Sequence, residues 1–307
     1  MSVISEANRS KKMKQSDGMI RSGSTRVGDW IIALICLIVM FVCLLPMLNV
    51  LARSLSDASA LMRNEVFLWP KGWNLIAYQT ILGNAKYIHS LWFTAILTVG
   101  CTLLSLLMTV CCAYPLTYDQ LKGGKVINIL ILFTMYFSAG TIPHYLLMKN
   151  LQMLDTVWCM VIPGCISVYN MIVMRSFFYG IPESLREAAE IDGAGPIRTL
   201  VQIYLPLSLP VLATLALFYA VGRWNGFSDA LLYVKKEELF PIQLYLYYVL
   251  QNSTQQEIAT QEGFATPGVG ETVKMATVMF ATVPILVVYP WLQRYFIAGM
   301  TIGAVKG

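Results

Sequence analysis

The chain has 307 residues, of which 57% are hydrophobic and only 13% are charged. Soluble domains carry about 25% charged residues, so the composition excludes an ordinary soluble protein and indicates an integral membrane protein. The formal net charge of +5 is small and requires no nucleic-acid partner.

Segments free of Asp, Glu, Lys and Arg divide the sequence into six apolar runs. Their lengths are 23, 32, 23, 19, 24 and 19 residues, and a helix needs roughly 20 apolar residues to cross the hydrocarbon core. The sequence therefore predicts an all-α, polytopic membrane protein with six transmembrane helices. In chain order the runs lie between Asp29 and Arg53, Lys86 and Asp119, Lys125 and Lys149, Asp155 and Arg175, Arg198 and Arg223, and Lys274 and Arg294.

The first run is too long for a signal peptide and is followed by Arg53 instead of a small-residue cleavage site, so we expect it to stay in the membrane. With the N-terminus inside, 13 of the 22 Lys and Arg residues fall on inside segments. This bias predicts that both termini are cytoplasmic. The expected organisation is an N-terminal tail over residues 1–29, a transmembrane domain over 30–297 and a C-terminal tail over 298–307.

Two outside segments differ in character. Residues 52–86 include Leu75–Leu82, which suits a short interfacial helix. Residues 226–271 become rich in Gln, Thr and Gly after Asn252, and we expect a polar loop there. All seven cysteines fall within the apolar runs, where buried Cys behaves as a small hydrophobe.

The inside segment between the fourth and fifth runs, residues 180–206, is mostly polar and is here called the interhelical module. Ser184 and Glu187 fit a Ser-x-x-Glu capping box, which predicts a helix that ends near Asp192. Gly193 then supplies a residue that adopts positive φ at a helix end. A second helix is expected from Pro196, with an apolar stripe made by Ile197, Leu200, Val201 and Tyr204.

The face of the first helix of the module favours a protein partner. Leu185, Ala188 and Ala189 share one face by their i, i+3, i+4 spacing, and small side chains permit close approach of another surface. The helix is acidic, with four carboxylates against Arg186, and anionic lipid headgroups repel such a helix. An amphipathic loop resting on the membrane is the alternative.

The module also carries a family resemblance. Its residues match, without a gap, the EAA loop of binding-protein-dependent ABC importer permeases, and they are Glu187, Ala188, Ala189, Gly193, Ile203, Leu205 and Pro206. The resemblance covers about residues 27–307 and includes "RWNGF" at 223–227 and "GMTIGAVKG" at 299–307. Within the family the chain is similar to the carbohydrate-uptake subfamily of maltose-importer type, and most similar to permeases for oligosaccharides of plant polymers or uronates.

The resemblance implies a bacterial plasma-membrane subunit that binds no cofactor itself. ATP and Mg would reside on two cytoplasmic ATPase subunits, whose groove receives the EAA helix as a coupling helix between spans four and five. A second, homologous permease and an extracytoplasmic sugar-binding protein would complete the importer. The family's C-terminal contact with the ATPase maps onto Thr301, Gly303, Val305, Lys306 and Gly307.

Other function classes have weaker support. The apolar runs contain no ionisable Asp, Glu, Lys or Arg that an ion-coupled transporter would use, and the chain lacks the G-x-x-x-x-G-K-[ST] phosphate loop. His89 and His144 are far apart in sequence, without an H-E-x-x-H pair, so neither an enzyme nor a metal site is expected. An importer of a non-sugar solute remains an alternative.

Substrate contacts are expected where the fifth span ends in "FYAVGRWNGFSD". Aromatic faces stack on sugar rings and amides bond to hydroxyls, so Tyr219, Trp224 and Asn225 are the candidates. An aromatic belt at the membrane interface is the competing interpretation.

Overall fold

The computed structural model describes residues 23–118, 120–261 and 269–304, and the described chain contains helices and no strands. The predicted N-terminal tail lies largely outside the described residues. The longer helices are α2 (Gly23–Ser54), α5 (Ala85–Ala113), α6 (Gly124–Tyr136), α7 (Thr141–Asn150), α9 (Val168–Tyr179), α10 (Glu183–Ile191), α13 (Leu209–Asn225), α15 (Ile242–Gln261) and α16 (Val269–Ala304). The shorter ones are α3 (Ala58–Met62), α4 (Ile76–Gly83), η1 (Pro115–Thr117), α8 (Trp158–Val161), α11 (Pro196–Thr199), η2 (Leu200–Tyr204), α12 (Leu205–Leu207), α14 (Ser228–Tyr233) and η3 (Glu237–Leu239).

Three helical stretches of the described chain are each long and apolar enough to cross a membrane: 28–54, 85–117 and 270–288. Two bent pairs pass the same test together: α6 with α7, at 114°, and residues 196–207 with α13, at 82°. The described residues thus offer three spans, or up to five if each pair forms one. The polytopic helical class is confirmed, whereas the six-span count and the orientation of the termini stay predictions.

The predicted fourth span differs from the others, because its run forms neither a single helix nor a bent pair long and apolar enough to cross a membrane. Its run forms α8 and α9, with a non-helical stretch between them that contains Pro163 and Gly164. Proline lacks the N–H that a helix interior needs, and glycine is the poorest helix former after proline. Backbone of this kind is tolerated at membrane depth only where protein or a water-filled cavity lines it.

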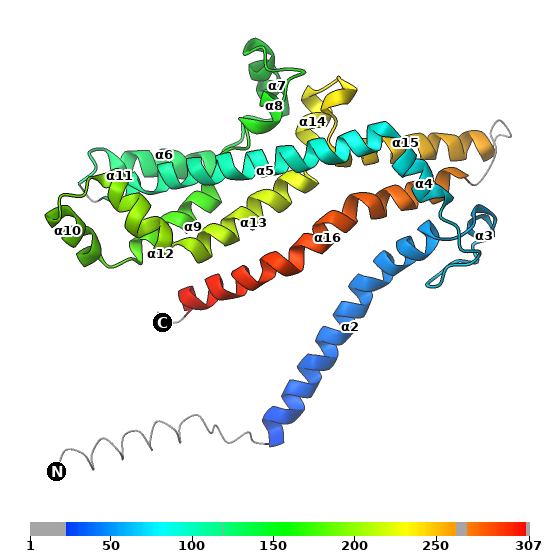
Figure 1. Cartoon of the computed structure of the whole chain (residues 1–307), viewed down its shortest axis with the longest axis horizontal. Coiled ribbons are helices and arrows are strands. Elements are labelled where there is room, and N and C mark those ends of the chain that lie inside the picture. The colour runs from blue at the N-terminus through cyan, green and yellow to red at the C-terminus, as the bar shows by residue number, and fades with distance from the viewer. Residues whose placement is uncertain (1–22, 119, 262–268, 305–307) are drawn as a thin grey trace.

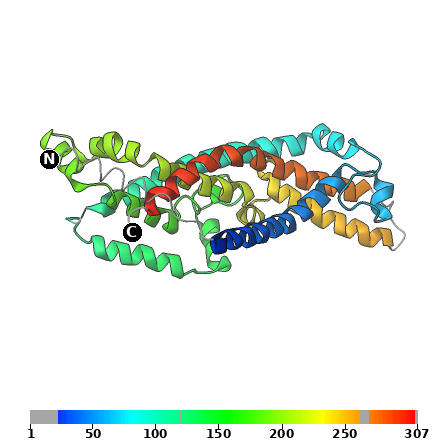
Figure 2. The same cartoon turned by 90° about the horizontal axis from the view of Figure 1, so that it is seen from below.

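Helices α5, α13 and α16 pack side by side along the long axis of the molecule, and α9 packs on α5 (Figure 1). Helix α2 contacts α16 and otherwise leaves the bundle. Figure 2 shows α6 standing apart from α5, and α6 has no buried residue. Within the described part of the chain, most of α2 and all of α6 therefore keep their apolar side chains largely exposed.

The face that α5 turns inward is rich in hydroxyls. Its buried polar side chains recur every three or four residues: Ser90, Thr94, Thr98, Thr102, Ser105 and Thr109. Thr94 returns a hydrogen bond of 2.6 Å to the carbonyl of Ser90, one turn earlier, and its oxygen also accepts the N–H of Ile242 at 2.8 Å. These bonds pin the start of α15 to α5.

The region expected to be a polar loop over residues 226–271 is largely helical. It contains α14, η3 and α15, and Ile242 and Leu244 of α15 are fully buried. The loop prediction was wrong because burial of the apolar start of α15 outweighs the weak helix propensity of the Gln- and Thr-rich part that follows. The predicted helix at Leu75–Leu82 is confirmed as α4.

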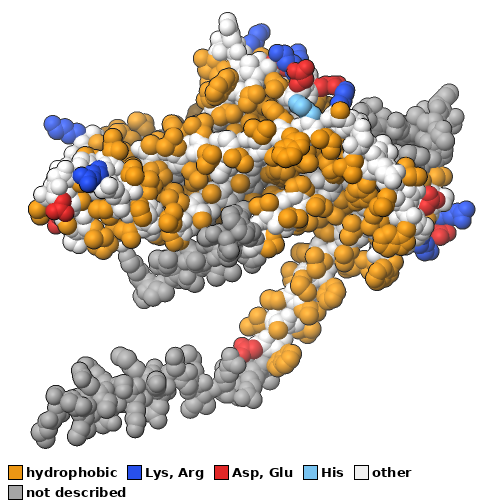
Figure 3. All heavy atoms as spheres, in the orientation of Figure 1, with side chains coloured by type: hydrophobic (Ala, Val, Ile, Leu, Met, Phe, Trp, Pro, Cys, Tyr) orange, Lys and Arg blue, Asp and Glu red, His pale blue; other side chains and the backbone are white. Residues whose placement is uncertain are grey.

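Hydrophobic side chains cover the long sides of the molecule, whereas Lys, Arg, Asp and Glu gather at its two ends and on the projection that carries α7 and α14 (Figure 3). The interhelical module occupies one end, and α3 and α4 lie near the other (Figure 1). At that second end an ion pair joins Arg53 of α2 to Glu271 of α16.

Candidate functional site

The first helix of the interhelical module, α10, begins after Pro182, which occupies the N-cap position without a side-chain bond. Ser184 therefore lies inside the helix, and the predicted capping box was wrong: the fixed φ of Pro182 already directs the chain into the first turn. The predicted end is confirmed. Gly193 has φ of 77°, and the N–H of Ala194 bonds to the carbonyl of Ala189 at 2.8 Å, as at a left-handed helix end.

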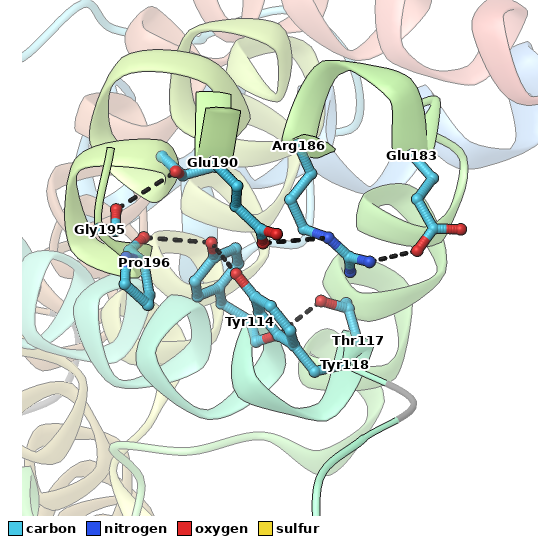
Figure 4. Close-up of polar contacts among 9 residues, drawn as sticks. Tyr114, Thr117, Tyr118, Glu183, Arg186, Glu190, Gly195 and Pro196 are labelled. Carbon is cyan, nitrogen blue, oxygen red and sulfur yellow. Dashed lines mark hydrogen bonds and ion pairs between the residues drawn. The ribbon is translucent and has the colours of Figure 1, made fainter. Parts of the chain in front are cut away.

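Arg186 is the cation that organises α10. It pairs with Glu183 one turn before it and with Glu190 one turn after it, at 3.7 Å in the second case. Its guanidinium lies 4.8 Å from the centre of the Tyr118 ring, and its side chain is only 17% exposed. The acidic helix is thus held through a shielded cation on the aromatic end of α5 and η1 (Figure 4).

Tyr114, the last residue before η1, fixes the second half of the module. Its hydroxyl lies 2.6 Å from that of Tyr118 and donates to the carbonyl of Pro196 at 3.1 Å (Figure 4). Its ring meets that of Tyr204 edge to face, with centroids 5.1 Å apart, a favourable aromatic geometry. Both halves of the module therefore rest on two tyrosines one helical turn apart.

The outward face of the module differs from the predicted one. Ala188 is exposed, and so is Leu185 at 41%, but Ala189 is only 8% exposed and packs inside the chain. The sequence could not separate these cases, because a small side chain permits close approach on either side of a helix. The large exposed residues are Ile191 at 87% and Ile197 at 79%, on either side of the Gly193 turn.

The second helix begins at Pro196 as predicted, but it widens into a π-helical turn, η2, at Leu200–Tyr204. The extra residue in this turn separates the predicted stripe: Val201 is 53% exposed, whereas Tyr204 is 4% exposed. Within the motif that suggested the family, Ile203 and Leu205 are half-buried and Pro206 is exposed. π-Helical turns are frequent at functional sites.

A second feature is a cavity of about 500 Å³ inside the bundle. It lies between α5, α13 and the break that separates α8 from α9, so the non-helical backbone of the fourth run lines it. Hydroxyl and amide groups on its wall include Ser105, Asn170 and Tyr219. These three side chains provide hydrogen-bond donors and acceptors without carrying a charge.

Of the three predicted substrate residues, the structure brings only Tyr219 to this cavity. Its hydroxyl lies 2.7 Å from that of Thr109 and accepts the N–H of Ser167 at 3.1 Å. Trp224 instead donates to the carbonyl of Ala281 on α16 at 3.2 Å, and Asn225 bonds back to its own helix at the Val221 carbonyl, at 3.0 Å.

Sequence reasoning missed the ion pair at the rim of the cavity. Arg223 is 11% exposed and bonds to both carboxylate oxygens of Asp229, to the carbonyl of Met160 at 3.0 Å and to that of Gly226 at 3.1 Å. This closes the turn from α13 into α14 and holds α8 against it. The available signal was an arginine at the boundary of the apolar run with an aspartate six residues later.

The predicted C-terminal contact residues are described only in part. Helix α16 continues through Ala304, so Thr301 and Gly303 lie within this helix. Val305, Lys306 and Gly307 lie outside the described residues.

Comparisons with known proteins give a consistent result. The profile of the family described as "Binding-protein-dependent transport system inner membrane component" matches residues 93–302. Protein LplC of Bacillus subtilis (strain 168) is 40% identical over 266 residues, covering 86% of this chain and 90% of LplC. The polygalacturonan/rhamnogalacturonan transport system permease protein YtcP of the same organism is 36% identical over 283 residues, covering 92% and 99%.

Among solved structures, one chain of a bacterial ABC transporter involved in the import of the acidic polysaccharide alginate superposes with a TM-score of 0.81. It is 33% identical in sequence, and the match covers 90% of this chain and 98% of that one.

Proposed function

The chain belongs to the family of binding-protein-dependent transport system inner membrane components, and on that premise we propose that its cargo is an oligosaccharide of uronates. It is the membrane permease subunit of an ABC importer, and a separate ATPase component hydrolyses ATP. The observation that carries the cargo proposal is the match, over almost their whole lengths, to one permease named for polygalacturonan and to one chain of an importer of acidic alginate.

The interhelical module is the proposed coupling element. An ATPase groove that moves α10 displaces whatever α10 is attached to, so the attachment must be firm. Arg186 on Tyr118 and Tyr114 on Pro196 join the module to α5, which runs the length of the bundle and lines the cavity. The exposed residues Leu185, Ile191 and Ile197 offer the apolar contact area that a groove would cover.

The proposed assembly contains a second permease, two ATPase subunits and an extracytoplasmic binding protein. The exposed apolar surfaces of α2 and α6 are consistent with the proposed second permease, because such surfaces face either lipid or another subunit in the membrane. Both termini are proposed to be cytoplasmic, which places the module on the ATPase side. ATP and Mg belong to the ATPase subunits.

We propose that the cargo contacts this chain at the cavity as it crosses the membrane. Its hydroxyl and amide wall suits sugar hydroxyls, and Tyr219 is the aromatic residue that connects it to α5 and α9. Arg223 faces the cavity but is already matched by Asp229, so the described lining of this cavity holds no unpaired cation for the uronate carboxylates. The second permease and the binding protein would supply that recognition.

Reconstituted uptake tests the cargo. Proteoliposomes holding both permeases and the ATPases, supplied with the binding protein, should import labelled oligogalacturonate at a rate that depends on ATP and exceeds that for a neutral glucan of equal length. Faster uptake of the neutral glucan would overturn the uronate proposal but keep the sugar class. Transport of only a non-sugar solute would overturn both.

A further inference from the structure

A second cavity, of about 390 Å³, lies beside the interhelical module between η1, the start of α6 and the end of α9. Its wall includes Tyr118, Lys125, Asn128, Arg175 and Tyr179. Because Tyr118 also carries Arg186 on its ring, the cavity and the coupling helix share one side chain. None of the described lining residues is acidic, whereas two are basic.

Arg175 is held in place without a carboxylate partner among the described residues. Its Nε donates to the carbonyl of Leu116 at 3.1 Å, one terminal nitrogen donates to Asn128 at 2.6 Å and the other to the Tyr179 hydroxyl at 3.0 Å. A guanidinium has five N–H donors, so two remain. Neutral partners fix its direction and leave its charge uncompensated, which is the arrangement that an incoming anion completes.

The start of α6 adds donors to the same wall. Gly123 begins the helix with φ of 81° and no side-chain cap, and the backbone N–H groups of Lys125 and Val126 have no acceptor among the residues that the structure describes. Free N–H groups in a first helical turn attract anions. Lys125 brings a second cation, which forms no ion pair with another described residue.

We infer that this cavity binds a phosphate group, either in the headgroup of an anionic phospholipid or as free inorganic phosphate. A planar guanidinium and helix N–H groups suit phosphate oxygens, and basic pockets between transmembrane helices bind anionic headgroups on the cytoplasmic side. The inference rests on the proposed function only in placing this cavity at the cytoplasmic side of the membrane. The phosphate would neutralise Arg175 and Lys125 and join α6 to α9 next to the coupling helix.

The test uses the whole importer, purified in detergent and placed in lipid nanodiscs of phosphatidylcholine alone or with phosphatidylglycerol. Retained phospholipid is measured by native mass spectrometry after transfer to detergent, and a separate arm titrates inorganic phosphate into lipid-stripped complex and follows its binding by ³¹P NMR. The variants are Lys125→Gln and Arg175→Gln. The matched control is Lys122→Gln, three residues away and not on the cavity wall.

Retention of phosphatidylglycerol by the wild type and by Lys122→Gln, weakened about fivefold in Lys125→Gln, supports the lipid source, since one basic residue contributes roughly this factor at an anionic surface. Binding of inorganic phosphate alone with the same ranking supports the free anion. Equal binding by Lys125→Gln and wild type overturns the inference, even if Arg175→Gln does not fold. A zero-length cross-link from Lys125 to a carboxylate of the ATPase overturns it too. None of these measurements depends on the cargo, so they leave the uptake test independent.

Discussion

The guanidinium of Arg186 lies over the ring of Tyr118, with 4.8 Å between its central carbon and the ring centroid. This contact ties the acidic helix α10 to the end of the helix that lines the central cavity. A cation over an aromatic face contributes about 0.5–2 kcal/mol, more when it is shielded from water. The attachment is therefore strong enough to transmit a displacement and small enough to be removed by one substitution.

Removing this attachment should uncouple the ATPase without dissociating it. Arg186→Leu and Tyr118→Ala should each reduce the stimulation of ATP hydrolysis by the loaded binding protein several-fold, because α10 keeps its outward face but loses its grip on α5. Tyr118→Phe keeps the ring and should retain most of the stimulation. The measurement is hydrolysis in proteoliposomes with and without the binding protein. Full stimulation in Tyr118→Ala would contradict the transmitting role.

Gly193 provides a test that depends on backbone conformation alone. A Cβ at this position would meet nothing within 4 Å, yet φ is +77°, so Gly193→Val incurs strain of about 1–3 kcal/mol without a clash. Uptake should fall sharply. The control is Gly195→Val, which also has open space but lacks positive φ. Equal uptake by the two variants would show that the left-handed turn is dispensable.

Ala188 and Ala189 should respond differently to the same enlargement. Ala189 is buried and Ala188 is exposed, so Ala189→Trp overpacks the contact with the chain and should lower the thermal stability of the permease. Ala188→Trp should leave stability unchanged but prevent the ATPase subunits from co-purifying. Thermal unfolding and co-purification are both measured. If the ATPase subunits co-purify with both variants, α10 is not part of the docking surface.

The partly buried pair of Arg223 and Asp229 should be needed for folding of the part of the bundle that contains α8 and α14. Asp229→Asn leaves an arginine that is 11% exposed without its counter-charge, while Asp229 itself is 27% exposed. Breaking a fully buried pair costs about 3–5 kcal/mol, which sets the upper limit for this partly buried one. The variant should unfold at lower temperature in detergent. Glu65→Gln, which disrupts the exposed pair with Lys71, is the control and should be neutral.

Topology is tested by chemical access. In a background without the seven native cysteines, Lys71→Cys should react with an impermeant thiol reagent applied outside intact cells. Ile191→Cys, at an 87% exposed position, should react only after the cells are opened. Labelling of both from outside would place the module on the wrong side for a cytoplasmic ATPase.

The parts of this structure that local chemistry dictates were predictable from the sequence. Gly193 ends α10 where a residue of positive φ was expected, and Pro196 begins the next helix. The break in the fourth run was also readable, because Pro163 and Gly164 stand in it, but counting charge-free residues ignores helix breakers. The sequence could not show which side chains face inward or which polar segments become helical. The burial of Ala189 and the helical structure of α15 both depend on neighbours from distant segments.

The ion pair between Arg53 and Glu271 joins the first long helix that the structure describes, α2, to the last, α16, 218 residues later. A ribosome adds about 5–20 residues per second, so α2 waits in the bilayer for roughly 10–40 s before its partner helix is made. During that interval its long apolar surface faces only lipid or another polypeptide. The order of synthesis thus makes α2 a helix that is free to meet the proposed second permease while its own bundle is still incomplete.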